Sequence, residues 1–183
     1  MNGFSHMESS IGKYVKAIPT YYQGVKFRSR LEASYAMALD SAGLRWAYEP
    51  EGYFIGDTAY LPDFWLPRIK TFLEIKGPTV PGLVKAKLLY QHFNRNQEEG
   101  RWFDPEFLVL WGDELGDVRS IVDDDRAVLG TCGVCGGKWF FALGGSYRCR
   151  DCGFYEGSHH ILSTQDKLEL QQIDLNISKR LAS

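Results

Sequence analysis

The segment that decides the fold is YLPDFWLPRIKTFLEIKG, residues 60–77, in which two apolar and aromatic runs flank Pro67-Arg68. A proline between such runs favours a turn, so we expect two consecutive strands. Because side chains alternate along a strand, Glu74 and Lys76 should point to the same side, roughly 6–7 Å apart. Asp63 lies on the preceding strand. The segment therefore predicts two carboxylates and one amine on neighbouring strands.

Further secondary structure is expected on both sides of this pair of strands. Ser29-Arg30-Leu31-Glu32 has the S-x-x-E form of a helix capping box, and apolar residues follow it at helical spacing as far as Gly43. The first part of the chain then has the order helix, three strands, helix, strand, which is an α/β arrangement. The three strands are expected around residues 46–55, 60–66 and 71–76, the second helix over residues 83–93, and a buried strand over residues 107–111.

The carboxylates have the chemistry that phosphodiester hydrolysis requires. A hard cation such as Mg²⁺ or Mn²⁺ neutralises the phosphate and lowers the pKa of bound water, and it prefers carboxylate ligands. Asp63 and Glu74 suit that role, while Lys76 would orient the attacking hydroxide or neutralise charge in the transition state. Glu32 either supplies a third carboxylate or only completes the capping box. Taken singly, an E-x-K triplet is usually a solvated pair and a Pro-Asp dipeptide a turn start, so the inference depends on their occurring together.

Four segments resemble the PD-(D/E)XK nuclease superfamily, and within it the phage-type junction-resolving endonuclease I branch. The segments are FRSRLE (27–32), GLRWAYE (43–49), YLPDFWLP (60–67) and LEIKG (73–77). The resemblance implies a restriction-endonuclease-like core of helix, three strands, helix and strand. It also implies a metal-dependent DNA endonuclease of a bacterial cell or a phage-infected host. Junction resolvases of that branch are intertwined dimers without a cysteine module, so specificity for branched DNA and a homodimer stay open.

The same resemblance assigns the catalytic residues by position. The family's helix glutamate falls on Glu32, its metal aspartate on Asp63, its second metal ligand on Glu74 and its lysine on Lys76. No residue of the family's motif is missing. We therefore expect these four residues to form one site.

The distribution of charge leaves a nucleic-acid partner open, although the formal net charge is −2. Residues 105–126 hold seven acids against two arginines, and this local −5 leaves +3 for the rest of the chain. Basic residues near the proposed site or in the C-terminal part are candidates for phosphate contacts, the usual source of sequence-independent DNA affinity. Solvated side chains are the alternative for each of them. The candidates are Lys26, Arg28, Arg30, Lys85, Lys87, Lys138, Arg148 and Arg150.

All four cysteines fall within residues 127–158, as Cys132-Gly-Val-Cys135 and Cys149-Arg-Asp-Cys152. This spacing is typical of a tetrahedral Zn²⁺ site, and four sulfur ligands leave no coordination position open, so the metal should be structural. Two disulfides are the alternative, disfavoured because the N-terminal residues lack the features of a secretory signal. We expect a zinc ribbon with a hairpin over residues 138–147. Its basic and aromatic residues would either contact DNA or pack the ribbon onto the core.

The expected division of the chain is a nuclease core over 1–111, an irregular acidic linker over 112–126, the zinc ribbon over 127–158 and a tail over 159–183, with a closing helix after Ser163 or Thr164. No apolar run approaches the roughly 18 residues of a membrane span, so we expect a soluble, cytoplasmic protein without a membrane partner. The function we expect is a Mg²⁺-dependent DNA endonuclease. The alternatives are a structure-specific resolvase of branched DNA and a non-enzymatic zinc-ribbon DNA-binding protein.

Overall fold

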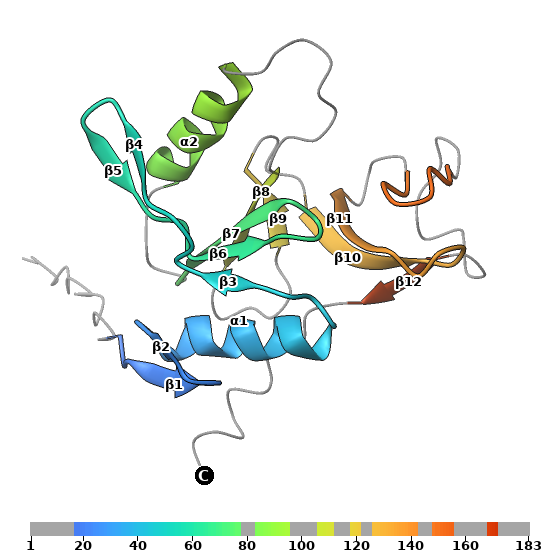
Figure 1. The fold of residues 1–183 in the computed structure, drawn as a ribbon, viewed down its shortest axis with the longest axis horizontal. Helices are drawn as coiled ribbons and strands as arrows, with labels where there is room; N and C mark the ends of the chain where they lie inside the picture. The colour runs from blue at the N-terminus through green and yellow to red at the C-terminus, as the bar shows by residue number, and fades with distance from the viewer. Residues whose placement is uncertain are drawn as a thin grey trace, which may run out of the picture.

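The computed structural model describes residues 17–77, 83–95, 106–111, 118–121, 126–142, 148–155 and 168–171 (Figure 1). The helices of this part of the chain are α1 (Arg30–Ser41) and α2 (Val84–Arg95). Its strands are β1 (Thr20–Tyr22), β2 (Val25–Phe27), β3 (Ala47–Tyr48), β4 (Tyr53–Ile55), β5 (Thr58–Tyr60), β6 (Phe64–Leu66), β7 (Thr71–Lys76), β8 (Glu106–Trp111), β9 (Val118–Ser120), β10 (Arg126–Cys132), β11 (Lys138–Ala142) and β12 (Leu168–Gln171). The protein is therefore a mixed α/β structure.

Helix α1 begins and ends as the sequence predicts. The Ser29 side chain accepts a hydrogen bond from the backbone N–H of Glu32, which satisfies one of the free donors of the first turn. At the other end Gly43 adopts a φ of 70°. Its N–H donates to the carbonyl of Asp40, and the N–H of Leu44 donates to the carbonyl of Leu39. These two bonds form a Schellman motif, which glycine at this position favours.

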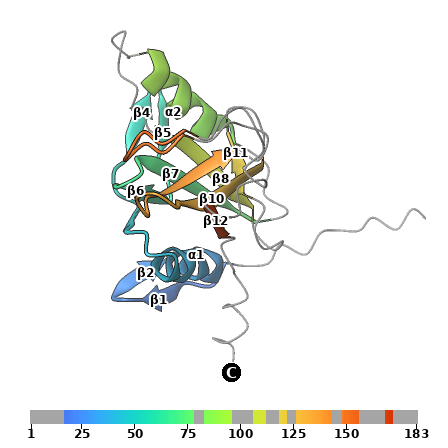
Figure 2. The ribbon, with the colours of Figure 1, turned by 90° about the vertical axis from the view of Figure 1, so that its right-hand side faces the viewer.

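The main sheet has the strand order β11-β10-β9-β8-β7-β6-β3, with β12 paired to β10. Strands β7 and β8 are parallel, and the other pairs are antiparallel. Helix α1 lies on one side of this sheet, and α2 lies on the other beside the β4–β5 hairpin (Figures 1 and 2). Leu73 belongs to the core that includes α1, while Phe72 belongs to the core that includes α2. The alternation expected along this strand is thus confirmed.

The first two predicted strands are each interrupted, which corrects the expectation of three continuous strands. Residues 46–55 form β3 and β4, and residues 60–66 contain only the end of β5 and then β6. Glu49 adopts a positive φ of 45°, outside the extended region, and Pro62 lacks the N–H that a strand would donate. The chain between β3 and β6 instead folds into the separate two-stranded β4–β5 hairpin.

The acidic segment 112–126 contains the strand β9 and the first residue of β10, so the expectation of an irregular linker is wrong there. Strand β9 pairs with β8 on one side and with β10 on the other. One sheet therefore continues from β7 and β8 into the cysteine-containing part. Residues 112–117 and 122–125 lie outside the described part of the chain.

The C-terminal tail supplies a strand where a helix was expected. Leu168–Gln171 forms β12, which pairs antiparallel with Leu129–Cys132 of β10. Leu168 and Leu170 alternate with polar residues, and strand pairing follows this period of two. The rest of the expected tail helix, residues 163–167 and 172–183, lies outside the described residues. Within the part of the chain that the structure describes, neither helix has the length and apolar character needed to cross a bilayer.

Candidate functional site

A pocket of about 520 Å³ brings together the four residues that the sequence singles out. Glu32 comes from the first turn of α1, Asp63 from the residue before β6, and Glu74 and Lys76 from the end of β7. These residues are separated by up to 44 positions in the chain, and only the fold makes them neighbours. The lining residues are Arg28, Glu32, Ala59, Tyr60, Leu61, Asp63, Glu74, Ile75, Lys76 and Lys85.

The pairing of β6 with β7 sets Asp63 beside Glu74. Phe64 lies opposite Leu73, so the next position of the same register places Asp63 opposite Glu74. The N–H of Ile75 donates to Asp63 Oδ2 at 2.7 Å, which fixes the carboxylate against the neighbouring strand. Asp63 and Glu74 are only 4% and 5% exposed, so two acidic groups are removed from water side by side.

This burial makes Asp63 difficult to ionise. Removal from water raises the pKa of Asp63 to about 7, and the charge of Glu74 adds to the rise. The Ile75 N–H and the Arg28 guanidinium oppose it without cancelling it. The charge of Arg28 does not fully offset the burial of this carboxyl group, and a bound cation would supply further positive charge.

The raised pKa predicts that unfolding stability in the absence of divalent cations falls as pH rises. The unfolded aspartate titrates near 3.9. Between that value and about 7 the folded state holds the extra proton, so the contribution of Asp63 to stability is fully present below pH 4 and is lost toward pH 7. We expect Asp63→Asn to remove this loss, so its stability relative to the parent chain should rise by at least about 1 kcal/mol between pH 5 and pH 8. Urea denaturation at the two pH values measures the difference, and an unchanged difference would contradict the assignment.

Glu74 is held from two sides. The Tyr60 hydroxyl donates to Glu74 Oε2 at 2.5 Å, and Lys76 Nζ donates to Oε1 of the same carboxylate. Burial, and next the charge of Glu74, raises the pKa of Tyr60, so the phenol stays protonated and remains a donor. Lys76 is a neighbour of Glu74 on one face of β7, as the alternation of side chains predicts.

Glu32 combines the two roles that the sequence left open. Its backbone N–H donates to Ser29 Oγ at 3.1 Å, and its carboxylate accepts from that hydroxyl at 3.0 Å, so it belongs to the helix cap. The carboxylate also lines the pocket, where it accepts hydrogen bonds from the Tyr48 hydroxyl and the Arg28 backbone N–H. Burial, and next the hydrogen bond to Glu32, raises the pKa of Tyr48 to about 12.

Sequence reasoning gave no role to three residues that hold this site in place, Tyr48, Glu49 and Tyr60. Glu49 forms an ion pair with Arg28, with Oε1 2.9 Å from Nε, and its backbone N–H donates to the carbonyl of Asp63 at 2.9 Å. Arg28 also forms an ion pair with Asp63. Tyr48, Glu49 and Tyr60 lie in the segments that carry the family resemblance, but no spacing rule within the chain marks them.

The basic residues proposed for DNA contact, apart from Arg28, fall into three groups. Lys85 lines the pocket and donates to the carbonyl of Ala59 at 3.2 Å. Lys26, Arg30, Lys87 and Arg148 are exposed and are not part of the pocket lining. Lys138 and Arg150 make contacts within the protein. Lys138 donates to the carbonyl of Ala42 at the end of α1, and the Arg150 guanidinium lies 5.2 Å from the centre of the Trp139 ring.

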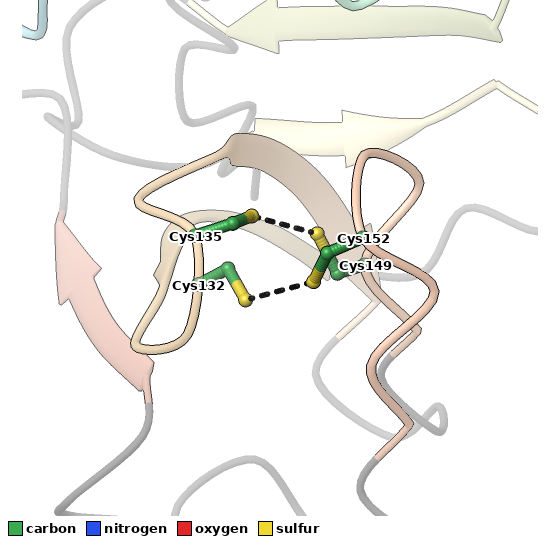
Figure 3. A group of neighbouring side chains, drawn as sticks. All are labelled: Cys132, Cys135, Cys149 and Cys152. Atoms are coloured by element: carbon green, nitrogen blue, oxygen red, sulfur yellow. Dashed lines mark hydrogen bonds between the residues drawn. The ribbon is translucent and has the colours of Figure 1, made fainter.

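The four cysteines form one cluster (Figure 3). Their sulfur atoms all lie within 4.8 Å of one another, with Cys132 and Cys152 Sγ 3.9 Å apart and Cys135 and Cys149 Sγ 3.4 Å apart. A disulfide would bring two sulfurs to about 2.05 Å, whereas Zn–S bonds of about 2.3 Å in a tetrahedron place them roughly 3.8 Å apart. All four cysteines are free thiols in this structure. The cluster is compatible with Zn²⁺ and not with two disulfides.

The two Cys-x-x-Cys turns have the same backbone structure. The carbonyl of Cys132 accepts from Gly136, and that of Cys149 accepts from Gly153, at 2.8 and 2.9 Å. Both glycines have positive φ, 72° and 73°, which other residues adopt only with strain. The Gly137 N–H donates to Cys135 Sγ at 3.4 Å. Two matched turns thus direct four thiols at one point.

The cysteine cluster is continuous with the core of the protein. Cys132, Cys149, Trp139 and Phe140 belong to the same buried cluster as Leu39 of α1 and Leu73 of β7. This favours packing over DNA contact for Trp139 and Phe140, which are 7% and 4% exposed. Strand β11 (Lys138–Ala142), the first half of the expected hairpin over 138–147, pairs with β10. Residues 143–147, its second half, lie outside the described residues.

Comparison of the chain with models of protein families, with curated proteins and with solved structures finds no match. The function is therefore inferred from the geometry of the two sites.

Proposed function

We propose that the protein is a metal-dependent DNA endonuclease with a restriction-endonuclease-like core. The observation that carries the proposal is the pair Asp63 and Glu74, buried side by side and joined in one pocket by Lys76 and Arg28. The order α1, β3, β6, β7, α2, β8, with the β4–β5 hairpin inserted after β3, is the order of helix, three strands, helix and strand that the sequence resemblance implies. Two carboxylates and two cationic side chains held together at a surface pocket suit a reaction on a charged substrate.

The donor set fits a hard divalent cation. Asp63 and Glu74 offer carboxylate oxygens, the ligands that Mg²⁺ and Mn²⁺ prefer, and Glu32 lines the same pocket. Burial, and next the charge of Glu74, raises the pKa of Asp63 to about 7, so a cation bound at this pair would add stabilising positive charge. A bound Mg²⁺ would neutralise the phosphate and lower the pKa of a water molecule.

The residues around the carboxylates hold them in place or supply positive charge. Tyr60 holds Glu74 through Oε2, and the Ile75 N–H holds Asp63 through Oδ2, so the two acids keep their spacing. The Lys76 ammonium, beside Glu74, neutralises charge that develops on the phosphate oxygens as the bond to the leaving oxygen breaks. The ion pair of Lys76 with Glu74 suits this electrostatic role.

A nucleic-acid substrate is supported by the cations at the rim of the pocket. Lys85 lines it, and the Arg28 side chain is 56% exposed, so both are accessible to phosphates that flank the cleaved bond. Arg30 is exposed at the start of α1, and Lys87 is exposed on α2, the helix that also carries Lys85. We propose separately that the four cysteines bind one structural Zn²⁺.

Incubation of the pure protein with linear, nicked, single-stranded and four-way-junction DNA tests the proposal, each with Mg²⁺ or with EDTA. We expect cleavage only with Mg²⁺. A preference for the junction would identify the resolvase alternative. Binding without cleavage of any DNA, at 10 mM Mg²⁺ or Mn²⁺, would instead favour a non-enzymatic DNA-binding protein and refute the proposed reaction.

A further inference from the structure

The guanidinium of Arg28 lies among three carboxylates of the protein. It forms ion pairs with Asp63 Oδ1 and, through Nε, with Glu49 Oε1 at 2.9 Å, and Nε lies 3.8 Å from Glu32 Oε2. Asp63 Oδ2 is already used by the Ile75 N–H. The Arg28 guanidinium thus occupies Oδ1, the Asp63 oxygen that the Ile75 N–H leaves free for a cation.

The Glu49 carboxylate pairs with a different nitrogen of Arg28 than Asp63 does. Its φ of 45° is a conformation that residues other than glycine adopt at a cost, and its N–H is fixed to the carbonyl of Asp63 at 2.9 Å. This backbone turn directs the Glu49 carboxylate to the side of the guanidinium that Asp63 leaves free. Arg28 therefore has three acidic neighbours, of which Asp63 and the more distant Glu32 are candidate metal ligands and Glu49 is not.

We propose that Arg28 is an internal counter-ion that competes with the catalytic cation for Asp63, and that Glu49 is the positioning residue that retains it after displacement. This inference depends on the proposed function. If Asp63 were engaged by a cation, the guanidinium would keep its ion pair with Glu49, and its terminal nitrogen would be free at the half-exposed rim of the pocket. A guanidinium there matches a phosphate oxygen in geometry and charge. Arg28 would then bind the substrate phosphate only in the metal-loaded site.

Metal affinity, measured without DNA, tests the inference. Mn²⁺ is titrated into the zinc-loaded full chain by calorimetry at pH 7.5. We expect Arg28→Gln to bind Mn²⁺ about tenfold more tightly than the parent chain, because a competing cation within ion-pair distance is removed. Arg30→Gln removes the same charge from an exposed side chain that is not part of the pocket lining, and it should change the affinity less than twofold.

The role of Glu49 is tested by a double-mutant cycle. Glu49→Gln should weaken Mn²⁺ binding several-fold in the parent chain, since Arg28 then has only Asp63 and the more distant Glu32 as acidic partners. In the Arg28→Gln background the same change should have less than half that effect. An equal effect in both backgrounds would mean that Glu49 acts on the cation directly, and it would overturn the positioning role.

Two outcomes separate this inference from the proposed function. If the parent chain binds no Mn²⁺ at the carboxylates, both are wrong. If the parent chain binds Mn²⁺ and folded Arg28→Gln binds it equally or more weakly, the inference alone is wrong. Folding is checked by circular dichroism, and Arg28→Lys serves if the glutamine variant unfolds. Lysine can pair with one carboxylate at a time, so its Mn²⁺ affinity should fall between those of the parent chain and the glutamine variant.

Discussion

Replacing Asp63 with asparagine is expected to lower the rate of Mg²⁺-dependent DNA cleavage by about a thousandfold or more. The amide is nearly isosteric and can still accept the 2.7 Å hydrogen bond from the Ile75 N–H, so the local structure should persist. What is lost is the negative charge that a divalent cation needs from the Asp63 and Glu74 pair. A thousandfold effect corresponds to about 4 kcal/mol of transition-state stabilisation. Glu74→Gln should have an effect of similar size, because its carboxylate is equally buried.

The matched control for this experiment is Asp57→Asn. Asp57 is an exposed carboxylate in the turn of the β4–β5 hairpin and is not part of the pocket lining, so its loss should leave the rate within a factor of two. Single-turnover cleavage at saturating protein separates the chemical step from DNA binding, which we expect to change little in Asp63→Asn. Cleavage by Asp63→Asn at the rate of the Asp57 variant would remove Asp63 from the mechanism.

Local signals in the sequence were sufficient for the elements that carry the candidate site. The S-x-x-E box at Ser29 and the glycine at residue 43 bound α1 because caps act within a few residues of the helix end. Likewise, alternation along β7 places Glu74 and Lys76 on one face because the period of a strand is a property of the backbone. These features depend on contacts close in sequence, and such contacts can be read from one chain.

The features that the sequence did not reveal depend on partners distant in the chain. Strand β9 has three residues and little apolar pattern, and it is defined by pairing with β8 and β10. The mixed apolar periods of 168–181 left helix and strand undecided, and pairing with β10 makes 168–171 a strand. Arg28 and Asp63 are 35 residues apart, so no local spacing predicts that an arginine proposed for phosphate contact is paired with a metal-ligand candidate.

The contacts between the cysteine cluster and the rest of the protein change the expectation for a chain truncated near Gly112. A separable ribbon would leave a folded core behind. Instead, Leu129, Trp139 and Phe140 are buried in the cluster that also contains Leu39 and Leu73. Arg68, between β6 and β7, forms a 3.0 Å ion pair with Asp151 in the second Cys-x-x-Cys turn. Truncation would expose the apolar surface that these residues cover, so the shorter chain should aggregate or melt early.

Loss of zinc is therefore expected to destabilise the whole protein. Structural zinc sites in small domains contribute roughly 10–16 kcal/mol of apparent binding free energy, and a protein of ordinary stability has about 5–15 kcal/mol in total. Cys149 is 1% exposed and is both a ligand candidate and a core residue, so Cys149→Ser removes a thiolate and leaves a buried hydroxyl. We expect this variant to hold less than the one zinc per chain of the parent protein and to melt at least 10 °C lower, in one transition that includes α1.

Val134→Ser, in the turn that holds Cys132 and Cys135, is the matched control for the zinc prediction. Val134 lies between them and is 60% exposed, so Val134→Ser alters the same turn without removing a ligand or a core contact. It should keep one zinc and melt within about 2 °C of the parent chain. Metal analysis gives the stoichiometry, and circular dichroism follows the melting of α1 and α2. A Cys149→Ser chain in which the helices melt at the parent temperature would show that the cysteine cluster folds separately from the core that carries Asp63 and Glu74. A parent protein with no zinc and four titratable thiols would show that the cluster is held by packing alone.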